Sequence, residues 1–434
     1  MLETLKNAWK VKEIRNKILF TIFIIIIFRI GSIIPVPYID VEALKSAAVS
    51  TAGSNQFFSY LSILTGGGLD YGAIFAMSVT PYINSSIIVQ LLCVAIPIFE
   101  RWQKEGEEGQ KKLAQVTRYT TVLLALIQGV AFFFYLKNGG GQVSSYLSVT
   151  GGATVFAAFV IVLAFTAGSA LVMWLGERID EKGIGNGISI LLFAGILSRG
   201  PQAFRALWAY FFELKEYVAV IGIIIVFLLI VAFVVWMTAA ERRIPVQYAK
   251  RVVGNKMYGG QNTHIPIKVN MSGVMPIIFA SSILMVPTMI LGFMNTAKQA
   301  TTFGKLLQLF SVQGVFYAVI YFLMIIGFAY FYATIQFNPV EMANNLRKNG
   351  GAIPGIRPGQ PTTDFISKIL SRITLMGAVF LSVIAILPIV IGNVGKINIS
   401  LGGTSLLIMV GVALDTVRNL ESQMMMRHYK GFLD

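Results

Sequence analysis

Few residues of this sequence belong to types that carry out covalent or metal chemistry. There are two histidines, His264 and His428, and one cysteine, Cys93, which lies inside an apolar block and cannot form a disulfide within the chain. The H-E-x-x-H pattern of zinc proteases and the G-x-x-x-x-G-K-[ST] phosphate loop are both absent from the sequence. The glycine-rich run 183–187 follows a charged segment rather than a strand, which argues against a dinucleotide site. We therefore expect no catalytic, cofactor or metal site. If the protein drives an energy-consuming process, a partner must supply the energy.

Ionisable residues inside apolar blocks would indicate ion coupling, and there are almost none. Arg29 lies deep in the first block, and Asp415 lies near the end of the last. Two interpretations of Arg29 stay open: a structural or snorkelling cation, or part of an ion path. Because no other acid inside the apolar blocks is available to pair with Arg29, the sequence argues against an ion-coupled transporter.

The elements that carry these residues are apolar blocks of about 20 residues, the length of a membrane-crossing helix. The chain of 434 residues is 56% hydrophobic and 13% charged, with a mean hydropathy of +0.72. The expected spans lie near 18–34, 73–98, 119–136, 152–174, 185–198, 217–238, 271–293, 313–335, 373–391 and 403–417. This predicts an all-α integral membrane protein of ten transmembrane helices, forming one membrane domain.

Charge between the spans predicts how the chain is oriented. Segments on the side of the N-terminus hold 26 of the 35 Lys and Arg residues, and segments on the opposite side hold 8. Basic loops stay in the cytoplasm, so both termini are expected there. The same bias accounts for most of the net charge of +15 without any nucleic acid.

Three features between or within the spans suggest a pore. The apolar segment 57–64 is too short to cross a membrane, so it is either a re-entrant helix or a helix on the outer surface. Spans 2 and 7 carry Pro81, Pro276 and Pro287 with several polar residues, as cavity-lining or closely packed helices do. The basic segments 239–270 and 336–372 are long loops. Such loops either dock an acidic partner or only carry the excess of Lys and Arg that marks the cytoplasmic side.

Long stretches of the sequence closely resemble the SecY family of protein-conducting channels over essentially the whole chain. They are IPVPYID at 34–40, TPYINSSIIVQLL at 80–92, TRYTT at 117–121, WLGERIDEKGIGNGISI at 174–190, RRIPVQYAKR at 242–251, THIPIKVNMSGVMPIIFASS at 263–282, FNPVEMANNLRKNGGAIPGIRPG at 337–359 and GGTSLLI at 402–408. The resemblance implies two pseudo-symmetric five-helix halves, 1–198 and 199–434, around a central pore closed by a short re-entrant plug helix at about 57–68.

The resemblance also implies site residues at matching positions. The pore ring would be Val79, Ile83, Ile188, Leu192, Ile278 and Ile408, where the family favours isoleucine, so Val79 and Leu192 depart from its pattern. The plug would include Phe57, Phe58, Tyr60, Leu61, Ile63 and Leu64, and the lateral gate Asn84, Gln90 and Asn270. Docking of a motor or ribosome would use Arg242, Arg243, Lys250, Arg251 and Arg357.

What the family does gives the remaining expectations. The chain would move unfolded secretory precursors across the bacterial plasma membrane and release signal or transmembrane segments into membrane lipid. The partners would be SecE and SecG, with SecA or a translating ribosome supplying energy. Two other classes stay open from the residues alone, a secondary transporter of small solutes and a membrane scaffold without an aqueous path.

Overall fold

The structure is a computed structural model, and it describes residues 8–50, 62, 65–137, 146–149, 153–212, 217–248, 251–253, 256–258, 262–271, 273–293, 304, 307, 309–310, 314–395 and 403–430. Contacts group the chain into two units. The first contains residues 1–220, 282–314 and 398–434, and the second contains residues 221–281 and 315–397.

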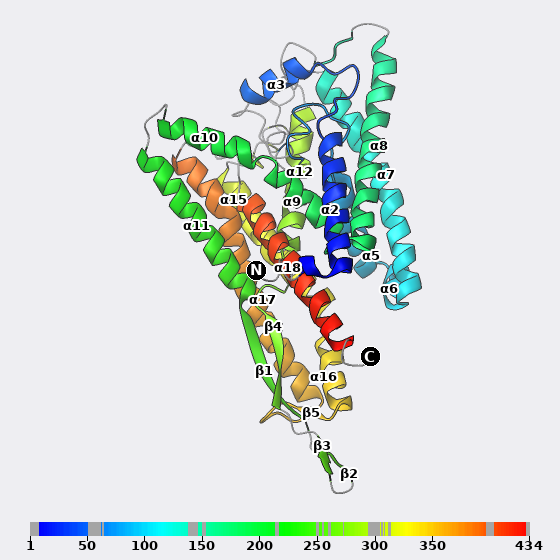
Figure 1. Ribbon diagram of the computed structural model, residues 1–434, viewed down its shortest axis with the longest axis vertical. Helices are drawn as coiled ribbons and strands as arrows, with labels where there is room; N and C mark the ends of the chain where they lie inside the picture. Colours follow the sequence, from blue (N-terminus) through cyan, green and yellow to red (C-terminus); the bar gives the residue numbers. More distant parts are fainter. Residues whose placement is uncertain are drawn as a thin grey trace. The chain divides into compact units, whose positions relative to one another are not determined.

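Each predicted span overlaps a helix along most of its length (Figure 1). These helices are α2 (Lys12–Gly31), α5 (Thr80–Ala95), α7 (Glu107–Lys137), α8 (Ala153–Lys182), α9 (Gly187–Leu197), α11 (Tyr217–Ala239), α12 (Met275–Phe293), α15 (Val315–Gln336), α17 (Gln360–Gly395) and α18 (Gly403–Lys430). Five described helices are long and apolar enough to cross a membrane, and α5 with α6 (Pro97–Lys104) adds a pair bent by 101°. The predicted helical membrane fold is confirmed.

The second span differs from its prediction at both ends. Its helix begins only at Thr80, because residues 65–78 form turns in which three glycines and Ser78 have positive φ. It ends at Ala95, since Ile96 is extended before Pro97 starts α6. Pro81, which the sequence places inside the span, lies in the first turn of the helix, where the missing N–H costs nothing. Pro276 likewise lies in the first turn of α12. Pro287, in contrast, lies inside α12 as predicted.

The first unit is built on helices that lie side by side. In it α7 packs on α5 and on α8, and α9 packs on α8 and α18. One buried cluster joins the turns after α2 to α7 and α8, and includes Val36, Phe132, Leu136, Ile161 and Phe165. A second one brings the two ends of the chain together: Ala8 and Ile14 pack with Ile184 and with Leu420 of α18. The first unit also contains α3 (Val41–Ser50) and α10 (Gly200–Phe212), helices outside the predicted spans.

In the second unit, two segments that the sequence predicts to be long loops form strands and helices. Segment 239–270 forms β1 (Glu241–Tyr248), β2 (Arg251–Val253), β3 (Lys256–Tyr258) and β4 (Asn262–Lys268), and segment 336–372 forms α16 (Pro339–Lys348), β5 (Gly351–Ala352) and the start of α17. The larger sheet has the order β4-β1-β5, with Ile244 opposite Ile265. Residues that face inward, Ile244, Val246 and Ile267, pack on Leu346 of α16 and Ile366 of α17. These basic segments are therefore a small folded body.

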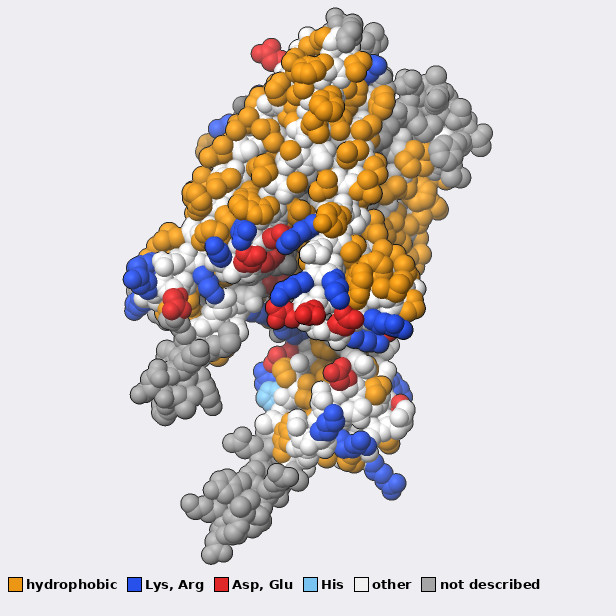
Figure 2. Space-filling view, turned by 90° about the vertical axis from the view of Figure 1, so that its right-hand side faces the viewer, with side chains coloured by type: hydrophobic (Ala, Val, Ile, Leu, Met, Phe, Trp, Pro, Cys, Tyr) orange, Lys and Arg blue, Asp and Glu red, His pale blue; other side chains and the backbone are white. Residues whose placement is uncertain are grey.

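The surface carries the two kinds of side chain that a membrane protein needs. In Figure 2 hydrophobic side chains cover much of the helical face, and Lys, Arg, Asp and Glu gather beside it. Exposed apolar residues such as Phe156 and Phe159 of α8 contribute to the first kind. Exposed ion pairs such as Lys104 with Glu100 and Lys111 with Glu107 contribute to the second.

Candidate channel constriction and plug anchor

The residues predicted for the pore ring lie on four helices, except for Val79, which caps one of them. Val79 precedes α5, Ile83 is on α5, Ile188 and Leu192 are on α9, and Ile408 is on α18, all in the first unit. Ile278 is on the part of α12 that belongs to the second unit. All are buried except Ile83, which is half-buried. The structure thus places five ring candidates in one unit, and their role stays a prediction.

A tight turn between α8 and α9 positions Ile188. The Asn186 side chain caps α9 by accepting a hydrogen bond from the amide of Ser189 at 3.0 Å. The amide of Gly187, the first residue of α9, donates a hydrogen bond to Asp180 Oδ1 at 2.8 Å. A Cβ on Gly187 would lie 2.0 Å from the Gly176 carbonyl oxygen, so only glycine permits this approach of the two helices.

The predicted plug positions Phe57, Phe58, Tyr60, Leu61, Ile63 and Leu64 lie outside the described residues. The turns directly after them, residues 65–78, are described. There Gly66, Gly67 and Gly72 all have positive φ, which glycine adopts without strain. Residues 72–74 are joined to 34–36 by backbone hydrogen bonds, from Val36 N to Gly72 O and from Ile74 N to Ile34 O. The chain after the plug segment is therefore anchored beside the end of α2.

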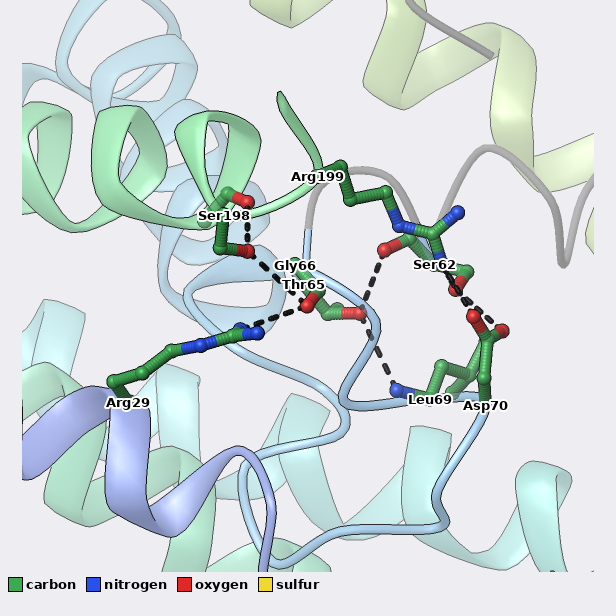
Figure 3. A network of polar contacts seen from close by, with 9 residues as sticks. Arg29, Ser62, Thr65, Gly66, Leu69, Asp70, Ser198 and Arg199 are labelled. Atoms are coloured by element: carbon green, nitrogen blue, oxygen red, sulfur yellow. Dashed lines mark hydrogen bonds and ion pairs between the residues drawn. The ribbon is translucent and has the colours of Figure 1, made fainter. Parts of the chain in front are cut away.

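Arg29 is part of the same anchor. Its guanidinium donates to the carbonyl oxygen of Gly66 at 2.8 Å, and Ser198 Oγ donates to the same oxygen at 3.2 Å (Figure 3). A Cβ on Gly66 would lie 2.5 Å from Ser198 Oγ, which leaves room only for glycine. Of the two interpretations of Arg29, the contacts support the structural cation, whose partner is a backbone carbonyl rather than an acid.

Sequence reasoning missed four residues of this anchor: Ser198, described above, and Ser62, Asp70 and Arg199. Arg199 follows α9 and donates hydrogen bonds to Ser62 and Asp70, and Ser62 Oγ donates to Asp70 Oδ1 at 2.5 Å (Figure 3). In the sequence Arg199 is only one loop cation among others, and Asp70 carries no motif. The one available signal is an acid two residues after the Thr65–Gly68 run, in an otherwise uncharged segment.

The predicted gate residues are half-buried. Gln90 of α5 donates to Ser86 Oγ at 3.4 Å, one turn away on the same helix, and Asn84 is also on α5. Asn270 directly precedes α12 in the second unit. The two groups thus belong to different units, and the gate stays a prediction.

Four of the five predicted docking residues are described, and they belong to the small folded body of the second unit. Arg242 and Arg243 are exposed on β1, and Arg243 pairs with Glu241 at 2.7 Å. Arg357 is exposed in the turn before α17, and Arg251 begins β2. Lys250 lies outside the described residues.

The fold defines a class of membrane proteins. It matches a solved structure described as a protein conducting channel with a TM-score of 0.63, over 94% of this chain and 92% of that one, at 18% identity. It also matches Sec61 in the canine ribosome-channel complex, with a TM-score of 0.57, the same coverage and 17% identity. The chain therefore has the same fold as these multi-pass membrane channels.

Sequence comparison identifies the family within that class. A family model of SecY matches residues 73–417. Curated relatives named protein translocase subunit SecY are 43% identical in Mycobacterium bovis, over 100% of both chains, and 43% identical in Thermotoga maritima, over 100% of this chain and 98% of the other. The chain belongs to the SecY family.

Proposed function

We propose that this chain is the protein-conducting channel of a bacterial plasma membrane, through which unfolded secretory polypeptides cross. The observation that carries this proposal is that the aliphatic ring candidates Val79, Ile83, Ile188, Leu192 and Ile408 belong to one unit, where all but Ile83 are buried, in a chain of this family. An aliphatic constriction offers ions no ligands and resists wetting when narrow. Its side chains can still move aside for a passing peptide, so it seals without selecting a sequence.

The proposed channel also opens sideways, at a gate that includes Asn84, Gln90 and Asn270. A segment in the pore then samples lipid, and its composition decides where it goes. Each central Leu or Ile favours the membrane by about 0.3 to 0.6 kcal/mol, whereas each central charge costs about 2.5 to 3.5 kcal/mol. Signal and transmembrane segments would leave into lipid, and polar segments would cross.

Energy would come from partners that dock on the cytoplasmic side. Strand β1 of the sheet β4-β1-β5 presents exposed Arg242 and Arg243, and the turn before α17 presents exposed Arg357; such basic residues suit an acidic protein or ribosomal RNA. We assign these residues to docking of the ATPase SecA and of the ribosome, and we expect SecE and SecG as small membrane subunits. The excess of Lys and Arg on one side supports cytoplasmic positions for both termini.

Site-specific photocrosslinking tests the proposal. A photoreactive residue is placed at Ile83, Ile278 or Ile408 in turn, and a secretory precursor is stalled during SecA-driven transport into membrane vesicles. The control probe is at Leu229 of α11, which is 64% exposed on an apolar helix. We expect crosslinks at the three ring positions and none at Leu229.

The same experiment separates the alternatives. If the precursor reaches the vesicle lumen without contacting any ring position, the pore assignment is wrong. Thiol labelling of single cysteines on α5 and α12 then tests the scaffold, which predicts no aqueous path. Uptake of small solutes into liposomes holding the chain would favour the transporter, which the scarcity of acids inside the apolar blocks argues against.

A further inference from the structure

The chain turns sharply where the helix of the second span ends. Ile96 is extended, Pro97 begins α6, and the pair of helices α5 and α6 is bent by 101° (Figure 1). Because α5 is the helix of a membrane span, a helix at about a right angle to it runs close to the plane of the membrane. With eight residues, α6 is also too short to cross the bilayer. The geometry thus places α6 along the membrane surface.

Contacts within this chain fix the direction of α6. The turn to α7 uses Gly106 at a φ of 76°, and a Cβ on Gly109 of α7 would lie 1.8 Å from the carbonyl oxygen of Trp102. The Trp102 ring meets the ring of Phe99 edge to face at 5.2 Å, and Lys112 of α7 lies 6.0 Å from its centre. Helices α6 and α7 therefore form a closely packed elbow.

The surface of α6 divides into an apolar and a polar side. Ile98, Phe99 and Trp102 share one side, and the polar residues take the other positions, namely Glu100, Arg101, Gln103 and Lys104. Ile98 is 57% exposed, as is Val94 near the end of α5 at 58%. Ile88 and Leu91 continue this exposed apolar stripe along α5. The apolar side of α6 is thus continuous with a side of the span that faces lipid.

Charge does not select the ligand of this surface. Residues 97–112 contain four acids and four bases, and six of these eight residues pair with each other: Lys104 with Glu100, Lys111 with Glu107, and Lys112 with Glu105. Such a segment has no net attraction for an acidic or a basic macromolecule. An amphipathic helix with Trp and Phe on its apolar side suits the boundary between lipid headgroups and acyl chains.

We infer that α6 is an in-plane anchor: its apolar side lies in the headgroup boundary of a phospholipid bilayer and holds the end of α5 at that depth. The ligand is the lipid surface, bound through Ile98, Phe99 and Trp102 rather than through charge. Because α5 is one continuous helix, the anchor also fixes the depth of the ring and gate candidates on it. The anchor is separate from conduction and goes beyond the proposed function.

Spin labelling tests the anchor. Cys93, the single cysteine, is replaced by alanine, and one nitroxide label is attached at Ile98→Cys, Lys104→Cys or Leu229→Cys. The channel, with its small membrane subunits, is placed in phosphatidylcholine vesicles, and contact of each label with oxygen and with a water-soluble nickel complex gives its depth. The label at 98 should lie about 5 to 10 Å inside the headgroup boundary. The label at 104 should lie in water, and the one at 229, near the middle of α11, should lie deepest.

A second measurement tests whether α6 holds α5. With the label moved to Val94→Cys, Ile98→Asp places a charge on the apolar side of α6 and should shift the label toward water. The matched control is Gln103→Asp, which adds the same charge on the polar side, where residue 103 is exposed, and should leave the depth unchanged. If Ile98→Asp does not fold, Ile98→Ser adds no charge and should produce a smaller shift in the same direction.

Three results would overturn the anchor. The label at 98 could be as accessible to the nickel complex as the label at 104, or shielded from both reagents, which would mean that a protein subunit covers it. It could also enter the bilayer only when phosphatidylglycerol is added, whereas an apolar anchor predicts the same depth in both lipids. An unchanged Val94 label in both variants of Ile98 would reject the hold on α5. None of these measurements uses a translocating chain, so they fail or succeed independently of the crosslinks at the ring.

Discussion

Replacing Gly187 by alanine is expected to separate α8 from α9 and to disturb the pore ring. The added Cβ would lie 2.0 Å from the carbonyl oxygen of Gly176 and 2.8 Å from its carbonyl carbon, and real Cβ contacts are essentially never under 3.0 Å. Both are backbone atoms, so no side chain can turn aside. The helices must therefore move apart by about 1 Å at this point.

The magnitude is set by the cost of overpacking a close contact. Such insertions typically cost about 1 to 3 kcal/mol, which corresponds to a fall in melting temperature of roughly 2 to 6 °C. The movement would also lengthen the hydrogen bond from the Gly187 amide to Asp180 and shift Ile188, the next residue and a ring candidate. We expect a less stable channel with higher idle conductance.

Thermal unfolding of the purified channel in detergent, followed by tryptophan fluorescence, measures the effect on stability. The matched control is Gly327→Ala in α15, where an added Cβ meets no atom within 4 Å. Alanine there should be neutral or stabilise the helix by about 0.5 to 1 kcal/mol. If Gly187→Ala melts at the same temperature as the wild-type channel and Gly327→Ala, the close approach of α8 and α9 is refuted.

Three further substitutions test other contacts. Arg29→Met removes the donor to the Gly66 carbonyl but keeps the apolar stem, so it should lower the melting temperature and raise idle conductance; unchanged values in both assays would contradict an anchoring role. Arg357→Glu changes an exposed residue, so it should weaken SecA-driven export while the melting temperature stays unchanged, and normal ATP-driven export would reject the docking assignment. Asn338→Ala removes the cap that accepts from the amide of Val340 at 3.1 Å, so it should destabilise α16 by about 1 kcal/mol, measured as earlier proteolysis of that segment, whereas wild-type proteolysis would show that the cap contributes nothing.

Much of the membrane fold could be predicted because it depends on local composition. Apolar blocks of about 20 residues mark helices wherever lipid is the solvent, and the predicted spans coincide with helices from α2 to α18. The limits of the second span were predicted less well. Its turns before Thr80 depend on positive φ at Gly66, Gly67, Gly72 and Ser78, and hydropathy does not detect backbone conformation.

The small folded body of the second unit could not be predicted from pattern. Segment 239–270 is basic and rich in turn residues, which is typical of a loop, but β1 and β4 pair along their length. Their stability comes from Ile244, Val246 and Ile267 packing on α16 and α17, which are distant in sequence. Strand propensity depends strongly on such packing, so sequence alone underestimates it.

The sequence by itself determined that lipid surrounds the chain, where its spans lie, on which side Lys and Arg collect, and that the apolar blocks hold no acid to pair with Arg29. Each of these depends only on residue type and on the order of neighbouring residues. Only the tertiary structure decided which groups meet. Arg29 bonds a carbonyl 37 residues away, and Arg199 pairs with an acid 129 residues away. No local spacing encodes contacts between residues so far apart in the chain, since they arise only when packing brings the ends of α2 and α9 to the same turn.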